Sequence, residues 1–343
     1  MELPAIADDP RVCVGAPPGS VLRRLGTSLR FPKAPHVPNF VWCALFTALG
    51  GFVFGFDTGS IGSITTMPQF VSQFSKTGTL STTAQGLIVS TILITASMAS
   101  LVSGPLSDRI SRTRTISLGG LIFAAGSTVS CAANALPMLF VGRLIAGIGE
   151  GLFLSAVTVY AVEIAPASAR GRLGSVVQLL ITMGIASGEQ PLTPVRPERN
   201  LRLVPSGYFI CYGTVRVPTS LSWRFPFGMQ AVIATVLAVG TPFLPHSPRW
   251  LRHVGRTADA DAAWVKLGVR SADAEKTEEN ASRDEAQKLS WWQEGQQVWK
   301  KGVRGRTALG IFLMGMQQVH SFIWEARIGQ RLKICSTLLG FGY

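Results

Sequence analysis

Two long stretches of this chain, residues 77–107 and 115–142, contain no Asp, Glu, Lys or Arg. A third stretch, residues 39–75, contains a single charged residue, Asp57. Uncharged apolar segments of roughly 18 or more residues are typical of helices that span a membrane. Only 15% of the 343 residues are charged, whereas a soluble domain has roughly a quarter. The sequence therefore predicts an all-α, polytopic membrane protein built as a helical bundle.

Seven apolar segments divide the chain into spans and loops. We expect the spans at about 40–62, 85–106, 115–134, 136–161, 172–190, 227–245 and 307–324. Residues 1–38 have no apolar core, so we expect a cytoplasmic tail there and no cleavable signal peptide. The remaining parts follow in order: a six-helix half at 39–245, a polar cytoplasmic helical loop at 246–306, the seventh span, and a C-terminal tail at 325–343.

The net charge of +13 comes largely from arginines that gather in alternate loops. The loops after the second, fourth and sixth spans are basic, whereas the loop after the first holds only Lys76 and the loop after the third holds no basic residue. Cytoplasmic loops collect positive charge, so we expect the N-terminus in the cytoplasm. No basic stripe alternates with aromatic residues, so a nucleic-acid partner is not expected. The five cysteines lack metal-ligand spacing, and we expect no metal and no cofactor.

Seven short motifs occur in order along the chain. They are GFDTGSIGSIT at 55–65, GPLSDRISRTR at 104–114, GRLIAGIGEGLFLSAVTVYAVEIAPASARGRL at 142–173, QLLITMGI at 178–185, WRFPFGMQ at 223–230, PHSPRWLRHVGR at 245–256 and GMQQVHSF at 315–322. Together they resemble the sugar-porter family of the major facilitator superfamily, most closely its fungal hexose and monosaccharide members. Residues 188–211 and 325–343 do not resemble the family, and we interpret the first of these stretches as an atypical insert.

The resemblance implies a function in transport and no enzymatic activity. We expect hexose/proton symport by alternating access in a multi-pass protein of the plasma membrane. Transporters of this class bind substrate between two six-helix halves, so a chain truncated after seven spans is expected to be too short to work alone. The expected partners are a sugar, a proton, the lipid bilayer, and either a second copy of the chain or a missing C-terminal half. Two alternatives stay open: a quinate- or polyol-type substrate, and a non-transporting sugar sensor.

Three ionisable residues in the predicted spans are candidates for proton coupling. Asp57 is the only acid in the first span, and an ionisable group inside a membrane helix is costly and usually functional. The resemblance implies that Asp57 takes the proton and pairs with Arg143, the alternative being a static ion pair that holds two spans together. Glu150 follows Arg143 by seven residues, which places both on the same side of one helix about 10 Å apart, so it is a second candidate.

Amide side chains are the candidates for sugar recognition. An amide both donates and accepts hydrogen bonds, as a pair of sugar hydroxyls requires. Gln178 lies in the fifth span, and the resemblance implies that it binds sugar hydroxyls. Gln317 and Gln318 of the seventh span match the paired glutamines of the family. The glycine and asparagine that follow in the family are replaced here by Ser321 and Ile323.

Charged residues at the ends of the spans are the candidates for a cytoplasmic gate. The resemblance implies a latch in which Asp108, Arg109 and Arg112 meet a second group, made up of Glu163, Arg170 and Arg249. A solvated topology anchor accounts for the arginines but leaves Asp108 unexplained. The chain departs from the family at two nearby positions, where Ser111 replaces a glycine and His246 replaces a glutamate.

Overall fold

The computed structural model describes residues 38–75, 80–188 and 219–269, together with Arg304, Gly305, Thr307–Leu309, Phe312 and Met316. All regular structure in these residues is helical, which confirms the predicted all-α bundle. The predicted seventh span is described only at those isolated positions. The atypical stretch at 189–211, both glutamines of the seventh span and the tail at 325–343 lie outside the described residues.

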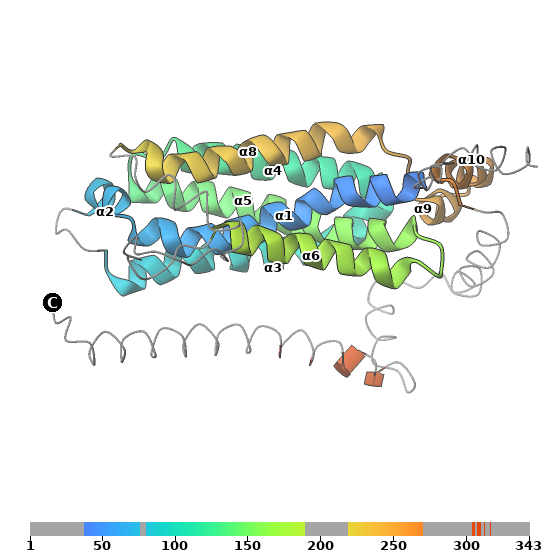
Figure 1. Cartoon of the computed structure of the whole chain (residues 1–343), viewed down its shortest axis with the longest axis horizontal. Helices are drawn as coiled ribbons and strands as arrows, with labels where there is room; N and C mark the ends of the chain where they lie inside the picture. The colour runs from blue at the N-terminus through green and yellow to red at the C-terminus, as the bar shows by residue number, and fades with distance from the viewer. Residues whose placement is uncertain are drawn as a thin grey trace, which may run out of the picture. The chain divides into compact units, whose positions relative to one another are not determined.

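Six long helices lie alongside one another and form the described bundle (Figure 1). They are α1 (Asn39–Thr66), α3 (Thr82–Ile110), α4 (Arg112–Cys131), α5 (Leu136–Glu163), α6 (Arg170–Gly188) and α8 (Leu221–Gly240). Short helices follow some of them: α2 (Pro68–Phe74), the 3-10 helix η2 (Thr241–Phe243), α9 (Pro248–His253) and α10 (Thr257–Leu267).

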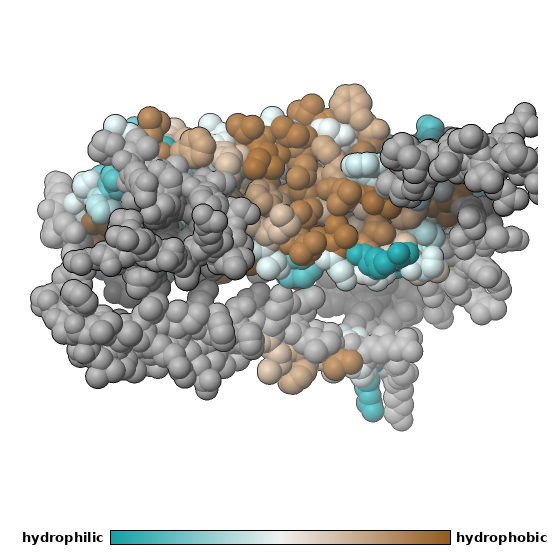
Figure 2. Space-filling model, viewed as in Figure 1, coloured by the Kyte–Doolittle hydropathy of each residue, from teal (hydrophilic) through white to brown (hydrophobic). Residues whose placement is uncertain are grey.

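Four of the described helices are long and apolar enough to cross a membrane. They are α1, α3, α5, and α8 continued into η2. The other two long helices, α4 and α6, are shorter, at 20 and 19 residues, and both begin with arginine. Figure 2 shows a field of hydrophobic residues over α8 and its neighbours. The exposed hydrophobic residues of α8 include Val232, Val236 and Val239. Such a surface suits contact with lipid chains.

Several helix turns meet at one end of the bundle, which we call the polar end. There α3 passes into α4 through the single residue Ser111, α5 passes into α6, and α8 leads through η2 into α9 and α10 (Figure 1). The side chain of Asn39 at the start of α1 donates to the carbonyl of Lys266 in α10 at 2.8 Å, so α1 also begins at this end. The motifs at 104–114, 163–173 and 245–256 therefore lie close together, although the chain separates them widely.

Glycines set the spacing between the helices. A Cβ added at Gly55 or Gly59 of α1 would overlap the backbone of Ile181 or Ile185 in α6. Two glycines of α5 have the same role against α3, where Gly147 faces Ile92 and Gly151 faces Ala96. Small residues let helix backbones approach closely, and packing of this kind drives helix association in a membrane.

The α1–α6 contact predicts opposite effects for two glycine substitutions on the same helix. Gly55→Ala is expected to destabilise the protein by about 1–3 kcal/mol, because the added methyl group has no room beside Ile181. Gly62→Ala meets no atom within 4 Å, so the better helix propensity of alanine is expected to stabilise by about 0.5–1 kcal/mol. Thermal unfolding of both variants in one detergent measures this difference, and equal midpoints would contradict the close contact.

Candidate functional site

A buried ion pair joins α1 to α5 in the interior of the bundle. Arg143 Nη1 lies 2.6 Å from Asp57 Oδ1, and both side chains are only 2% exposed. The Nε and Nη2 groups of Arg143 are buried and have no hydrogen-bond partner among the described residues. An ion pair excluded from water interacts strongly but is costly to bury. The structure therefore places together the two residues that the sequence predicts as a pair.

Glu150 adds a second acid to this interior, two turns along α5 from Arg143. Its side chain is buried, and Oε2 has no hydrogen-bond partner. The charges of Asp57 and Arg143 are close enough to act on Glu150. These three side chains carry a net charge of −1 if all are ionised and zero if one acid holds a proton.

A polar contact that the sequence interpretation missed lies one turn along α1 from Asp57. Gln230 of α8 donates from Nε2 to Ser60 Oγ at 3.4 Å, and both side chains are buried. Gln230 Oε1 has no partner. Gln230 is an amide inside an apolar span, which in the sequence indicates a polar contact. Its partner Ser60 on α1 could not be predicted, because it lies 170 residues away in the chain. Ser60 and Gln230 extend the polar interior from α1 to α8.

The predicted sugar-binding glutamine lies apart from this interior. Gln178 is exposed on α6, and the neighbouring Thr182 is also exposed and donates its hydroxyl to the Gln178 carbonyl at 3.0 Å. Among the described residues no group forms a hydrogen bond with the Gln178 amide side chain. The amide is therefore free to bind a group from outside the six-helix half.

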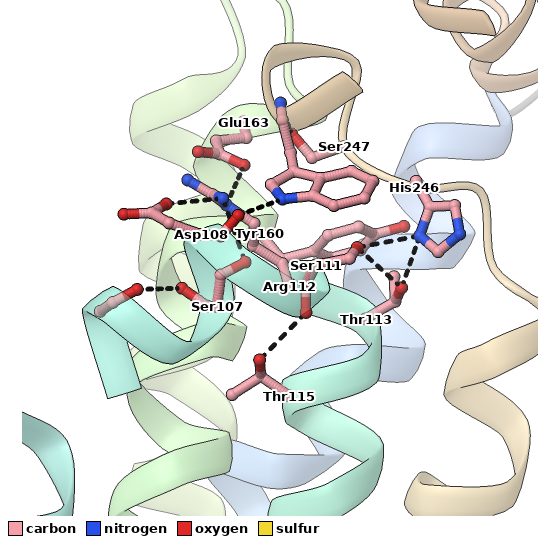
Figure 3. Close-up of polar contacts among 12 residues, drawn as sticks. Ser107, Asp108, Ser111, Arg112, Thr113, Thr115, Tyr160, Glu163, His246 and Ser247 are labelled. Atoms are coloured by element: carbon pink, nitrogen blue, oxygen red, sulfur yellow. Dashed lines mark hydrogen bonds and ion pairs between the residues drawn. The ribbon is translucent and has the colours of Figure 1, made fainter. Parts of the chain in front are cut away.

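A second polar cluster, consisting of Asp108, Arg112 and Glu163, lies at the polar end (Figure 3). Arg112 at the start of α4 places Nη1 2.8 Å from Asp108 Oδ1 and Nε 3.0 Å from Glu163 Oε2. The second contact is a charge pair without hydrogen-bond alignment, since both atoms lack a hydrogen-bond partner. Glu163 is the last residue of α5, so Arg112 links the ends of α3, α4 and α5. We call these three residues the salt-bridge cluster.

The other three predicted gate residues make no ion pair or hydrogen bond within the described part of the chain. Arg109 is exposed on the last turn of α3. Arg170 begins α6 and has Nε and Nη2 buried without partners, and the Nε of Arg249 in α9 is likewise unpartnered. The charge of Arg249 is close enough to act on Arg170. The polar end thus combines a formed cluster with three arginines that have no acidic partner among the described residues.

The loop between η2 and α9 packs against the α3–α4 turn. Trp250 donates from Nε1 to the Asp108 carbonyl at 2.8 Å, and Tyr160 of α5 donates its hydroxyl to the Pro245 carbonyl at 2.8 Å. Ser247 caps the N-terminus of α9 by accepting from the Trp250 backbone N–H. These contacts fix α9 beside the salt-bridge cluster.

Comparison with known proteins identifies the family. A family model described as "Sugar (and other) transporter" matches residues 43–193 and 203–322. The chain belongs to this family. The break in the match falls inside residues 188–211, the stretch whose sequence does not resemble the family. Members of this family are transporters, so the prediction of a non-enzymatic protein is confirmed.

Two relatives show how this sugar-transporter family member compares with longer chains. The glucose transporter GlcP of Staphylococcus epidermidis is 32% identical over 67% of this chain and 45% of its own length. The human proton myo-inositol cotransporter is 35% identical over 66% of this chain and 31% of its own length. The chain therefore spans less than half the length of these relatives.

A solved structure shows the same fold. The proton:xylose symporter XylE of the major facilitator superfamily, bound to 6-bromo-6-deoxy-D-glucose, matches with a TM-score of 0.58 and 23% identity. The match covers 70% of this chain and 52% of that chain. The sugar-transporter chain is thus a multi-pass membrane protein with the major facilitator fold. Among its described residues no group of three or more potential metal-binding side chains occurs.

The buried ion pair of this family member predicts a large asymmetry between two arginine substitutions. Arg143→Ala is expected to cost about 3–5 kcal/mol of stability, because it leaves Asp57 buried without its partner. Arg256→Ala removes an exposed pair with Asp259 at 2.7 Å and is expected to cost at most about 1 kcal/mol. The thermal unfolding midpoints of Arg143→Ala and Arg256→Ala in detergent measure this difference in stability. The double change Asp57→Asn with Arg143→Met is expected to recover most of the loss, and failure to recover it would show that Arg143 acts through packing alone.

Proposed function

We propose that this chain forms the sugar- and proton-binding half of a monosaccharide/proton symporter. The observation that carries the proposal is the buried Asp57–Arg143 pair, a titratable acid inside the bundle with a single basic partner. Support also comes from a relative that is itself a proton cotransporter and from the membership of the chain in the sugar-transporter family.

Asp57 is the proposed proton acceptor. Protonation of its carboxyl group removes the charge that holds Arg143 Nη1 at 2.6 Å, so the pair between α1 and α5 weakens. Protonation then frees Arg143 to interact elsewhere, which couples a proton to the arrangement of two helices. Glu150 is the second proposed proton site, because its Oε2 lies in the same interior without a partner.

Gln178 is the proposed sugar contact of the described bundle, with Gln317 and Gln318 of the predicted seventh span as further contacts. The Gln178 amide is exposed on α6 and unused by the described residues. Sugar hydroxyls require such donor–acceptor groups. In the proposed alternating-access cycle the sugar lies between this face and a second half, supplied by another copy of the chain or by a separate C-terminal half.

The polar end is the proposed cytoplasmic gate. Asp108, Arg112 and Glu163 form its closed contacts, and Arg109, Arg170 and Arg249 are the arginines available to acids of the opposing half. The alternation of basic loops supports a cytoplasmic N-terminus, and we propose the plasma membrane as the location. A polyol-type substrate is the second candidate, favoured by the relative that carries myo-inositol.

Transport assays test the coupling. In cells that lack hexose transporters, uptake of labelled glucose and entry of protons are followed together, with this chain alone and with a co-expressed C-terminal half of a relative. Asp57→Asn is expected to abolish sugar-driven proton entry while counterflow of sugar persists, because the neutral amide cannot carry a proton. The matched control Asp261→Asn changes an exposed acid of α10 and is expected to transport as the parent does. Unchanged proton entry in Asp57→Asn would refute the proposed acceptor.

Gln178→Ala tests the sugar contact on the same system. The KM for the sugar is expected to rise roughly threefold to tenfold, since a lost hydrogen bond costs about 0.5–1.5 kcal/mol. Ser175→Ala, at an exposed position of the same helix, serves as the matched control and is expected to leave the KM unchanged. Equal KM values for all three proteins would exclude Gln178 from the binding face. Inhibition by myo-inositol that is stronger than inhibition by glucose would favour the polyol-type substrate.

A further inference from the structure

His246 contacts the α3–α4 turn through two hydroxyl groups at once. Its Nδ1 lies 2.9 Å from Ser111 Oγ and 2.8 Å from Thr113 Oγ1, and the two hydroxyl oxygens are 3.3 Å apart (Figure 3). Both hydroxyl side chains are buried. The Nδ1 atom of His246 therefore joins the loop after η2 to the α3–α4 turn through both hydroxyl groups.

Ser111 is the single residue between α3 and α4, and its backbone is strained. It has φ 95° and ψ 147°, and it is the one residue other than glycine with a positive φ in the described part of the chain. Residues that carry a side chain rarely adopt this backbone conformation, and it persists only where surrounding contacts stabilise it. The His246 contact is one of the interactions that hold it.

The charged groups around His246 are mostly basic. Arg114 of α4 and Arg256, which precedes α10, both act on the ring, and Tyr160 of α5 contacts the adjacent Pro245. A pocket of about 310 Å³ opens beside His246 and is also lined by Arg256, Asp259 and Lys266. The one acid among these, Asp259, already pairs with Arg256. A proton on His246 would therefore add positive charge to a site with no free acid among the described pocket residues.

We propose that His246 is a proton-sensitive contact that joins the loop after η2 to the α3–α4 turn when neutral and releases it when protonated. The pocket gives water and protons access to the ring. Release would also loosen the turn that carries Asp108 and Arg112, because Trp250 binds the Asp108 carbonyl from the same loop. An effect of this release on transport rests on the proposed function of the polar end as a gate. The proton-sensitive contact of His246 does not depend on that proposal.

The direction of the pH dependence follows from the charges. Burial, Arg114 and Arg256 together lower the pKa of His246 below its ordinary value of 6.5. The joined state therefore binds fewer protons than the released state, and joining is favoured as the pH rises. The contact is complete above about pH 6.5, and it weakens as the pH falls from that value towards the lower pKa of the joined state.

Trp250 reports on this contact without a transport assay. Its ring centroid lies 5.5 Å from that of His246, and its side chain is only 7% exposed. The full-length chain is labelled with 5-fluorotryptophan in detergent, and Trp250→Phe assigns its ¹⁹F resonance. We expect this resonance to shift with a midpoint below pH 6.5. Its broadening by a soluble gadolinium chelate is expected to increase over the same pH range, because release exposes the ring.

Three variants make the test decisive. His246→Gln is expected to abolish the shift, whereas His253→Gln, which changes an exposed histidine of α9, is expected to retain it. Arg114→Gln removes one exposed positive charge and is expected to raise the midpoint towards 6.5. A shift that survives in His246→Gln, or a shift without greater broadening by the chelate, would overturn the proposal. The assay measures no sugar, so its failure is distinguishable from failure of the symport proposal.

Discussion

The bundle depends on one interaction, the buried ion pair of Asp57 with Arg143 at 2.6 Å. A carboxylate and a guanidinium group are each costly to place in an apolar interior, and each is tolerated here because the other is present. The pair therefore fixes α1 against α5, while the glycines of α1 fix it against α6. Glu150 lies in the same interior and forms no ion pair with the described residues, which is why it is the second proposed proton site.

The polar end depends on weaker contacts. Arg112 at the N-terminus of α4 and Glu163 at the C-terminus of α5 both oppose the dipoles of their own helices. Their mutual attraction offsets this, and Asp108 adds a partner that is half exposed and open to screening by water. The Arg112–Glu163 pair, with side chains 12% and 10% exposed, is less deeply buried than the Asp57–Arg143 pair, so breaking it is expected to cost less. The two sites thus differ in their exposure to water, and this difference sets how strongly the charges attract each other at each site.

Much of this arrangement could be predicted from the sequence, because charge is scarce in it. The uncharged stretches predict the long helices, and Asp57 and Arg143 stand out as charges in apolar spans. The partner of Glu163 was harder to predict, since Arg109, Arg112 and Arg170 all lie near the ends of helices and only packing selects Arg112. The partner of Gln230 and the positive φ of Ser111 depend on contacts between distant segments, which neither periodicity nor composition encodes.

The one-residue connection between α3 and α4 has a mechanical consequence. Ser111 leaves no slack between two long helices, and Gly147, Gly149 and Gly151 hold α5 tightly against both of them. These three helices are therefore held as one rigid unit, so a displacement of the α3–α4 turn would be carried along the full length of α3.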